Sequence, residues 1–192
     1  LMFYTMSVGD FMKRCSWAEN ADEIYVRYHD EEWGVPVYED EKLFEMLILE
    51  SFQAGLSWIT ILKKRENFRN ALDQFDILKI VQYDDAKIEE LMQNKGIVRN
   101  RLKIKATINN AKIFLDIQKE YGSFSAYIWH FTNHEIIYGN GTLTSNELSD
   151  TISKDLSKRG MKFVGSVIIY AYLQAIGIIY DHHETCFMYK TK

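Results

Sequence analysis

One carboxylate, Glu50, lies inside an otherwise apolar stretch of the chain and is the first candidate for chemistry. In "KLFEMLILESFQAG" (residues 42–55), helical spacing puts Glu50 on the same stripe as Leu43 and Leu47. A buried, unpaired carboxylate is costly, so such a residue is neutralised, paired or kept for a ligand. Either Glu50 bonds to a nearby tyrosine or tryptophan and fixes the core, or it lines a pocket and binds a cationic or N–H-rich group.

Aromatic side chains gather in the first third of the chain, beside polar and charged neighbours as in "YVRYHDEEWGVP" (residues 25–36). The group consists of Trp17, Tyr25, Tyr28, Trp33 and Trp58. Core packing accounts for at least part of it. The sharper interpretation is a flat ligand bound between aromatic rings.

Two cysteines near opposite ends of the chain suggest a metal site. Cys15 is followed by His29, and His182 precedes Cys186 by four residues, one helical turn, so each pair can point at one ion. Two cysteines and two histidines would close a tetrahedral zinc shell, which is typical of a structural site because no position is left for water. His183 is a rival for His182, and free buried thiols with surface histidines are the alternative.

The stretch "LMQNKGIVRNRLKIKATINNA" (residues 91–111) favours a helix-hairpin-helix. Gly96 lies at the tight turn, and the next helix opens with Arg99 and Arg101. A glycine lets the backbone approach a ligand, and the free N–H groups at a helix N-terminus favour a phosphate. A plain αα-corner remains the alternative.

The sequence "AGLSW" follows Glu50 after a short gap. Gly55 is expected to end or kink the preceding helix, Leu56 to be presented at the turn, and Ser57 to cap the next helix.

The elements that must position these residues are predicted to be helices. A single proline, Pro36, and ten glycines suit short connections, and sustained strand alternation is absent. Gly139 to Gly141 mark a turn. We therefore predict an all-α fold, with residues 12–192 forming one catalytic domain of two helical lobes and residues 1–11 a leader without functional weight. Helices are predicted at 41–54, 57–70, 77–81, 86–94, 101–120, 123–131, 148–158 and 165–178.

Composition limits the class of protein. A net charge of −4 over 192 residues argues against a protein that coats nucleic acid through its overall charge. Three clusters of basic residues could still form a local nucleic-acid-binding surface. No apolar run is long enough to span a membrane and no secretory signal is recognisable, so we expect a cytoplasmic protein. The basic clusters are 63–65, 99–105 and 158–162.

Taken together, these motifs resemble the 3-methyladenine DNA glycosylase I family, base-excision repair enzymes of the helix-hairpin-helix superfamily. The resemblance runs from Lys13 to Cys186 and rests on "RCSW", "YVRYHDEEWGVP", "LFEMLILESFQAGLSWITILKKRENF", "GIVRNRLKI", "SKDLSKRGMKFVGS" and "DHHETC". It implies a monomeric, all-α enzyme whose termini are joined by a structural zinc. The implied reaction flips 3-methyladenine out of alkylated double-stranded DNA and hydrolyses its N-glycosidic bond, without strand cleavage.

The resemblance also assigns residues. It implies zinc ligands at Cys15, His29, His182 and Cys186. It implies base binding by Trp17, Tyr25, Tyr28, Trp33, Glu50 and Trp58, with Glu50 and Tyr28 as the catalytic positions. It implies DNA contacts at Gly55, Leu56, Gly96, Arg99 and Arg101.

The aspartate that many members of the superfamily carry after the hairpin is not matched here, so no general base is assigned. Asp116 follows the hairpin but is interpreted as a surface residue. Phe52 stands where relatives often carry a polar residue, and a Phe52 that points toward the gap would change strand contacts.

Two other classes are open. A DNA-binding module could recognise alkylation lesions without cutting, and would bind damaged duplex without releasing base. A zinc-dependent hydrolase of small nucleobases would need an open coordination site, against which the four-ligand count argues.

Overall fold

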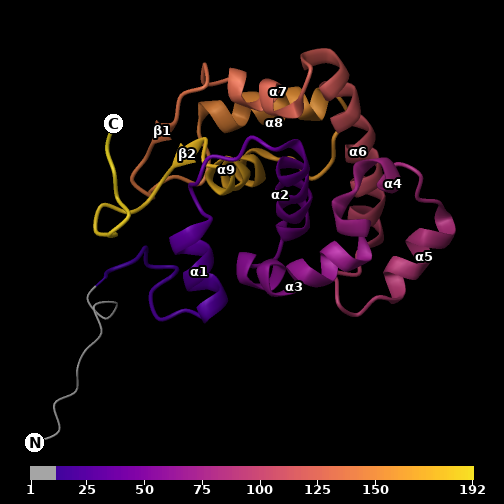
Figure 1. The fold of residues 1–192 in the computed structure, drawn as a ribbon, viewed down its shortest axis with the longest axis horizontal. Coiled ribbons are helices and arrows are strands. Elements are labelled where there is room, and N and C mark those ends of the chain that lie inside the picture. The colour runs from indigo at the N-terminus through magenta and orange to yellow at the C-terminus, as the bar shows by residue number, and fades with distance from the viewer. Residues whose placement is uncertain (1–11) are drawn as a thin grey trace, which may run out of the picture.

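The structure is a computed structural model that describes residues 12–192; the expected leader at 1–11 lies outside the described residues. The described part is mostly helical, as predicted (Figure 1). The helices are α1 (Glu23–Glu31), α2 (Asp40–Gln53), α3 (Trp58–Ala71), α4 (Ile77–Ile80), α5 (Asp85–Gln93), α6 (Arg101–Tyr121), α7 (Phe124–His130), α8 (Glu147–Lys158) and α9 (Ser166–Ala175), with a 3-10 turn η2 (Asp73–Phe75) and strands β1 (Ile137–Tyr138) and β2 (Ile179–Tyr180).

Helix α2 lies at the centre and α9 packs beside it (Figure 1). Ten consecutive residues of α2, 43–52, are buried, so this helix is enclosed on all sides rather than amphipathic. The other helices surround this pair: α3 contacts α2 from one direction, while α6 and α7 contact it from others. A carboxylate on α2 is therefore placed in the interior of the molecule.

Local capping explains where several helices begin. The side chains of Asp84, Asn100, Ser123 and Asn146 each accept a hydrogen bond from a backbone N–H in the first turn of α5, α6, α7 and α8. Ser57 occupies the expected cap position of α3, but its hydroxyl hydrogen-bonds to Thr60 Oγ1 at 2.8 Å and not to a backbone amide. The predicted side-chain cap is therefore wrong at Ser57.

Helix α1 was not among the predicted helices. Its sequence, EIYVRYHDE, is rich in β-branched and aromatic residues of modest helix propensity, and tertiary contacts override that preference. Arg65 of α3 donates two hydrogen bonds to Glu32, of 2.6 and 2.8 Å, directly after α1. Lys63 forms an ion pair with Asp22 before it. Packing on α3 thus fixes α1, which carries several of the candidate residues.

The chain also contains a short pair of parallel strands, which the sequence pattern did not predict. Ile137 is paired with Ile179 and Tyr138 with Tyr180. Two residues per strand are too few to produce a detectable alternation. The pairing brings the 139–141 turn next to residues 181–183.

The segments near the two ends of the described chain, around Lys13 and Phe187, lie side by side. The Phe187 N–H donates a 2.8 Å hydrogen bond to the Lys13 carbonyl, and the N-terminal segment lies beside the C-terminal one in Figure 1. Arg14 adds a bidentate pair with Asp30 of α1. Among residues 12–192, no helix has the length and apolar character needed to cross a bilayer.

Candidate functional site

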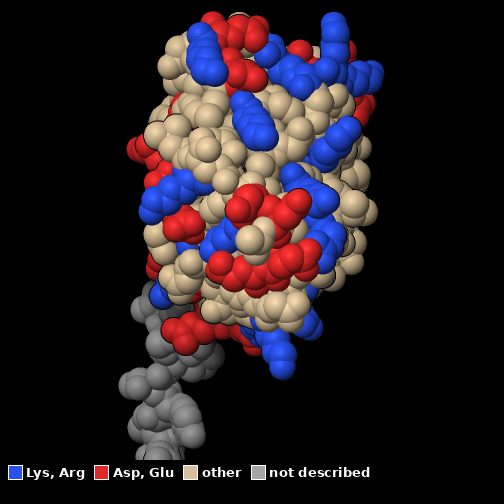
Figure 2. Space-filling model, turned by 90° about the vertical axis from the view of Figure 1, so that its right-hand side faces the viewer, with Lys and Arg blue, Asp and Glu red and all other residues tan. Residues whose placement is uncertain are grey.

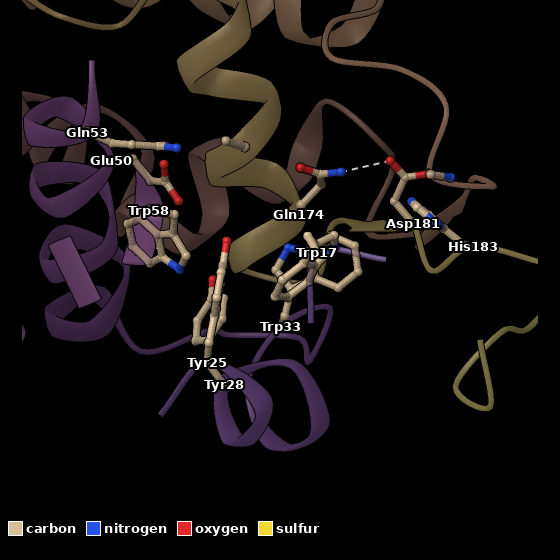
Figure 3. Close-up of a pocket in the computed structure, with 12 residues that line it drawn as sticks. Trp17, Tyr25, Tyr28, Trp33, Glu50, Gln53, Trp58, Gln174, Asp181 and His183 are labelled. Carbon is tan, nitrogen blue, oxygen red and sulfur yellow. Dashed lines mark hydrogen bonds between the residues drawn. The ribbon is translucent and has the colours of Figure 1, made fainter. Parts of the chain in front are cut away.

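A pocket of about 210 Å³ opens between α1, α2 and α3 on one side and residues 171–183 on the other (Figure 3). The six residues to which the sequence analysis gave base-binding roles all line it. They come from separate elements: Tyr25 and Tyr28 from α1, Glu50 from α2 and Trp58 from the start of α3. The complete lining is Trp17, Tyr25, Tyr28, Trp33, Glu50, Gln53, Trp58, Gly141, Ala171, Gln174, Asp181 and His183.

Five of the twelve lining residues are tryptophans or tyrosines. The ring centroids of Trp17 lie 4.8 Å from Tyr25 and 5.1 Å from Trp33, and those of Tyr28 and Trp58 are 5.5 Å apart. In Figure 3 both tyrosines rise from α1 toward Glu50 and Trp58. Such rings offer electron-rich faces to a flat or cationic ligand.

Glu50 is almost fully buried, at 2% exposure. Its Oε2 has no hydrogen-bond partner, and no hydrogen bond to its side chain is found among residues 12–192. The alternative in which a tyrosine or tryptophan ties Glu50 into the core is therefore wrong. Burial raises the pKa of the Glu50 carboxyl to about 8.

Two further polar atoms at the pocket are buried and unpaired within the described chain, Gln53 Oε1 and Trp58 Nε1. Buried polar groups are normally satisfied, so three unsatisfied groups on the lining of one pocket indicate a site built for a polar ligand. The pocket thus combines aromatic faces with acceptors and a donor.

One wall of the pocket, around Asp181, was not predicted from the sequence. Asp181 is 1% exposed and accepts hydrogen bonds from Gly141 N–H at 2.7 Å, Tyr170 OH at 2.9 Å and Gln174 Nε2 at 2.7 Å. Gly141 has φ of +75°, and a Cβ there would come within 1.9 Å of the His183 ring. The available signal was the predicted 139–141 turn, but its partner in space is 40 residues away.

The four predicted metal ligands form a single cluster. Their candidate ligand atoms lie within 4.8 Å of one another, and all four residues are buried. His182 Nδ1 is 3.6 Å from each cysteine sulfur, and His29 Nε2 is 3.5 Å from Cys186 Sγ. The cluster could hold a metal ion, and it joins the N-terminal and C-terminal regions. His182, rather than its rival His183, belongs to it.

The surroundings of the cluster suit a metal. His29 Nδ1 lies 2.8 Å from Asp30 Oδ1, which orients the ring so that Nε2 faces the sulfurs. Burial lowers the pKa of His182 to about 4 and that of His29 as well, which keeps both rings in the neutral form that binds metals. The backbone N–H groups of His183 and Met188 each donate to a cysteine sulfur at 3.4 Å.

The metal cluster and the pocket share a wall. The ring centroid of His29 is 5.1 Å from that of Trp17, and His182 is 4.7 Å from Trp33. Both tryptophans line the pocket.

The predicted hairpin is present between α5 and α6. The Gly96 N–H donates to Asn94 Oδ1 at 2.8 Å, so this amide is used within the turn itself. The next amides that lack an acceptor among the described residues are those of Val98 and Arg99, and Arg99 is exposed. Arg101 pairs with Glu89 of α5 at 2.9 Å.

Charge near the hairpin is mixed in sign. Figure 2 shows one end of the molecule with acidic and basic side chains interspersed. The ion pairs Arg101–Glu89 and Lys87–Glu90 lie at the surface in this region. Asp116, the acid after the hairpin, is on the surface as predicted and pairs with Lys119.

The turn at residues 54–57 follows α2 and is exposed at Gly55, Leu56 and Ser57. Gly55 has φ of +79°, which favours glycine, and Leu56 is 43% exposed. Phe52 is buried, with its ring centroid 4.7 Å from that of Phe68. It therefore points into the core and not toward the turn.

Comparisons with known proteins agree over nearly the whole chain. The family model described as "Methyladenine glycosylase" matches residues 17–189. DNA-3-methyladenine glycosylase 1 of Escherichia coli (strain K12) is 45% identical over 183 residues, covering 93% of this chain and 97% of that protein. A crystal structure of 3-methyladenine DNA glycosylase I superposes with a TM-score of 0.89 at 44% identity, over 93% of this chain and 100% of the other. A variant of 3-methyladenine DNA glycosylase I in complex with 3-methyladenine superposes with a TM-score of 0.88 at 35% identity, over 94% of this chain and 99% of that chain. The chain belongs to the methyladenine glycosylase family.

Proposed function

We propose that this protein is a DNA-3-methyladenine glycosylase, which releases 3-methyladenine from alkylated duplex DNA. The observation that carries the proposal is the unpaired, buried Glu50 carboxyl at the aromatic pocket. The similar proteins from other sources are named as 3-methyladenine DNA glycosylases, and the structure of one of them contains bound 3-methyladenine.

Base recognition follows from charge and hydrogen-bonding chemistry. Methylation at N3 makes the adenine cationic while it is attached to the sugar, and a cationic ring stacks favourably on Trp17, Tyr25 or Trp58. Glu50 accepts a hydrogen bond from the exocyclic N6 amine. The positive base also supplies the counter-charge that a buried carboxylate lacks, which favours the ionised form of Glu50.

The reaction needs little acid–base chemistry because a cationic base is already a good leaving group. The damaged nucleotide is flipped out of the base stack of the duplex, and its base enters the desolvated pocket. Glu50 and Tyr28 hold the leaving base, and the negative charge on Glu50 gives electrostatic support as the sugar becomes oxocarbenium-like. Among the described residues that line the pocket there is no lysine, the usual amine nucleophile for strand cleavage, which supports a reaction that stops at base release.

DNA contacts are proposed at two turns. The hairpin amides near Gly96, with Arg99 and Arg101, anchor phosphates. Leu56, presented by the left-handed Gly55, fills the gap left by the flipped nucleotide, where an apolar wedge offsets lost stacking. The proposed enzyme acts as a monomer of one domain with two helical lobes.

Zinc is the metal that best fits the four-residue cluster. The candidate ligand atoms lie within 4.8 Å of one another, and a set of two cysteines and two histidines is typical of structural zinc. When bound, zinc would tie the segment around Cys15 to the segment around Cys186. All four positions are filled by protein, so the site lacks the open position that a zinc-dependent hydrolase needs.

Chromatography of the base released from methylated duplex DNA tests the proposal directly. We expect free 3-methyladenine with wild-type protein, without release of 7-methylguanine and without strand scission. No release from a folded, metal-loaded sample that still binds the damaged duplex would overturn it. That result would favour the non-catalytic lesion-binding module.

A further inference from the structure

Lys103 is a buried lysine that the proposed reaction does not use. Only 6% of it is exposed, and no carboxylate pairs with it among residues 12–192. Its Nζ donates to the carbonyls of Phe52 at 2.7 Å and Ala54 at 2.6 Å, and lies 5.7 Å from the centroid of the Phe163 ring. The lysine therefore connects the first turn of α6 to the end of α2, about 50 residues earlier.

Burial of an uncompensated ammonium is unfavourable, and it lowers the pKa of Lys103. The two acceptors explain what offsets this cost. The last carbonyls of a helix have no donor within the helix, and the C-terminal end carries partial negative charge that attracts a cation. Lys103 thus acts as a side-chain cap for α2, supplied by a different helix.

The 54–57 turn begins at this cap, because Ala54 is one of the two acceptors. One hydrogen bond from Leu56 N–H to Gln53 O holds it locally, and a Cβ placed on Gly55 would meet nothing within 4 Å. The outer side of the turn is therefore open. The side-chain hydrogen bonds at its base come from Lys103.

Lys103 is fixed on its other side by the hairpin. Its backbone N–H donates at 3.1 Å to Asn100 Oδ1, the N-cap of α6. One residue is thus bonded through its backbone to the start of the hairpin helix and through its side chain to the turn that carries Leu56. No other described residue hydrogen-bonds both segments through its side chain and backbone in this way.

We propose that Lys103 is a positioning residue that sets the 54–57 turn relative to the hairpin. Leu56 then enters the duplex at a fixed distance from the phosphates that the hairpin holds. The inference rests on the proposed function, because it assumes that both turns face DNA. Lys103 does not line the proposed base pocket.

A double-mutant cycle with Leu56 tests this role. The probe is a duplex that carries a tetrahydrofuran abasic-site analogue, which leaves a gap for the wedge and needs no base release. We expect Lys103→Met to weaken binding about tenfold, or about 1.4 kcal/mol. In a Leu56→Ala background the same change should alter affinity by less than about twofold, because the wedge is already gone.

Two variants serve as controls. Lys105→Met removes an exposed positive charge from the same helix, so its effect should be small and equal in both backgrounds. Lys103→Arg keeps a cationic hydrogen-bond donor and should hold affinity within about threefold of wild type. If Lys103→Met does not fold, Lys103→Gln takes its place in the same cycle.

An equal loss in the wild-type and Leu56→Ala backgrounds would overturn the inference, and so would unchanged affinity in Lys103→Met. Binding of free 3-methyladenine, followed by tryptophan fluorescence, should match wild type. Its loss would place the effect of Lys103 in the pocket and also overturn the proposal. Absence of base release by the wild-type protein would overturn the proposed function alone, since the cycle reads only DNA binding.

Discussion

At the scale of single residues, Glu50 combines an ionisable carboxyl with nearly complete burial and no hydrogen-bond partner for Oε2 among the described residues. Replacement by Gln keeps the shape of the side chain and an oxygen that can accept from N6, but removes the negative charge. We expect Glu50→Gln to slow 3-methyladenine release by about 100-fold while the circular dichroism spectrum is unchanged, in line with loss of one electrostatic contact in a desolvated site. An unchanged rate would remove Glu50 from the site.

The pH dependence of stability gives an independent check on Glu50. Its pKa is about 8 in the folded protein and near 4.3 when unfolded, so the folded state binds the extra proton between these values. Stability should therefore fall as pH rises through this window, by up to about 1.4 kcal/mol per pH unit. Below the unfolded pKa the carboxyl is neutral in both states and the penalty is absent.

Glu50→Gln supplies the control, because it removes this titration and leaves every other group in place. Urea denaturation of both proteins from pH 5.5 to 8.5 should show the variant gaining stability relative to wild type as pH rises. Parallel curves over that range would mean that Glu50 does not titrate there.

A functional residue could be predicted from the sequence when it differs from the pattern of its sequence neighbours. Glu50 stands out because an acid occupies an apolar stripe, and His182 is distinguished by its four-residue spacing from Cys186. Asp181 gives no such sign. Its partners Tyr170 and Gly141 are ordinary in sequence, and only the fold brings them to one carboxylate.

At the scale of elements, the hairpin makes a prediction about salt. Arg99 is exposed two residues before α6 begins, where a phosphate would be bound. We expect Arg99→Ala to weaken binding to all duplexes similarly and to reduce the slope of log K against log salt concentration by about 0.9. Fluorescence anisotropy between 50 and 200 mM salt would measure the slope.

Lys119→Ala is the matched control for Arg99. It removes one exposed positive charge at the far end of α6, about 27 Å from Arg101 along the helix axis. Its slope should equal that of wild type. If both variants lower the slope equally, or neither does, the DNA lies elsewhere on the surface.

Most helices could be predicted from the sequence, whereas helix α1 and the β1–β2 strand pair could not. Helices α2 to α9 have apolar residues in long runs or at helical spacing, and several begin with a capping side chain. Helix α1 is too rich in β-branched and aromatic residues for local propensity to indicate it, and the Arg65–Glu32 pair that fixes it is a long-range contact. The β1–β2 pair is likewise produced by tertiary packing.

At the scale of the whole molecule, the four-residue cluster of Cys15, His29, His182 and Cys186 joins the N-terminal region of the chain to the C-terminal region. Cys186→Ser removes one of the four proposed ligands, and we expect metal content and thermal stability to fall together. A loss of about 10 °C in Tm would correspond to about 3 kcal/mol for a chain of this size. Thr185→Ser, an exposed neighbour, should change neither quantity. Elemental analysis that finds no zinc in pure wild-type protein would exclude zinc as the ion.

Loss of the metal should also weaken ligand binding in the pocket, because the rings of His29 and His182 pack against Trp17 and Trp33. Without the metal, the His29 and His182 rings are no longer held in place against these tryptophans. Affinity for free 3-methyladenine should then fall about tenfold at a temperature where the protein stays folded. Tryptophan fluorescence titrations of Cys186→Ser and Thr185→Ser would measure it. A lower Tm with unchanged base affinity would mean that the cluster stabilises the chain ends without positioning the aromatic walls.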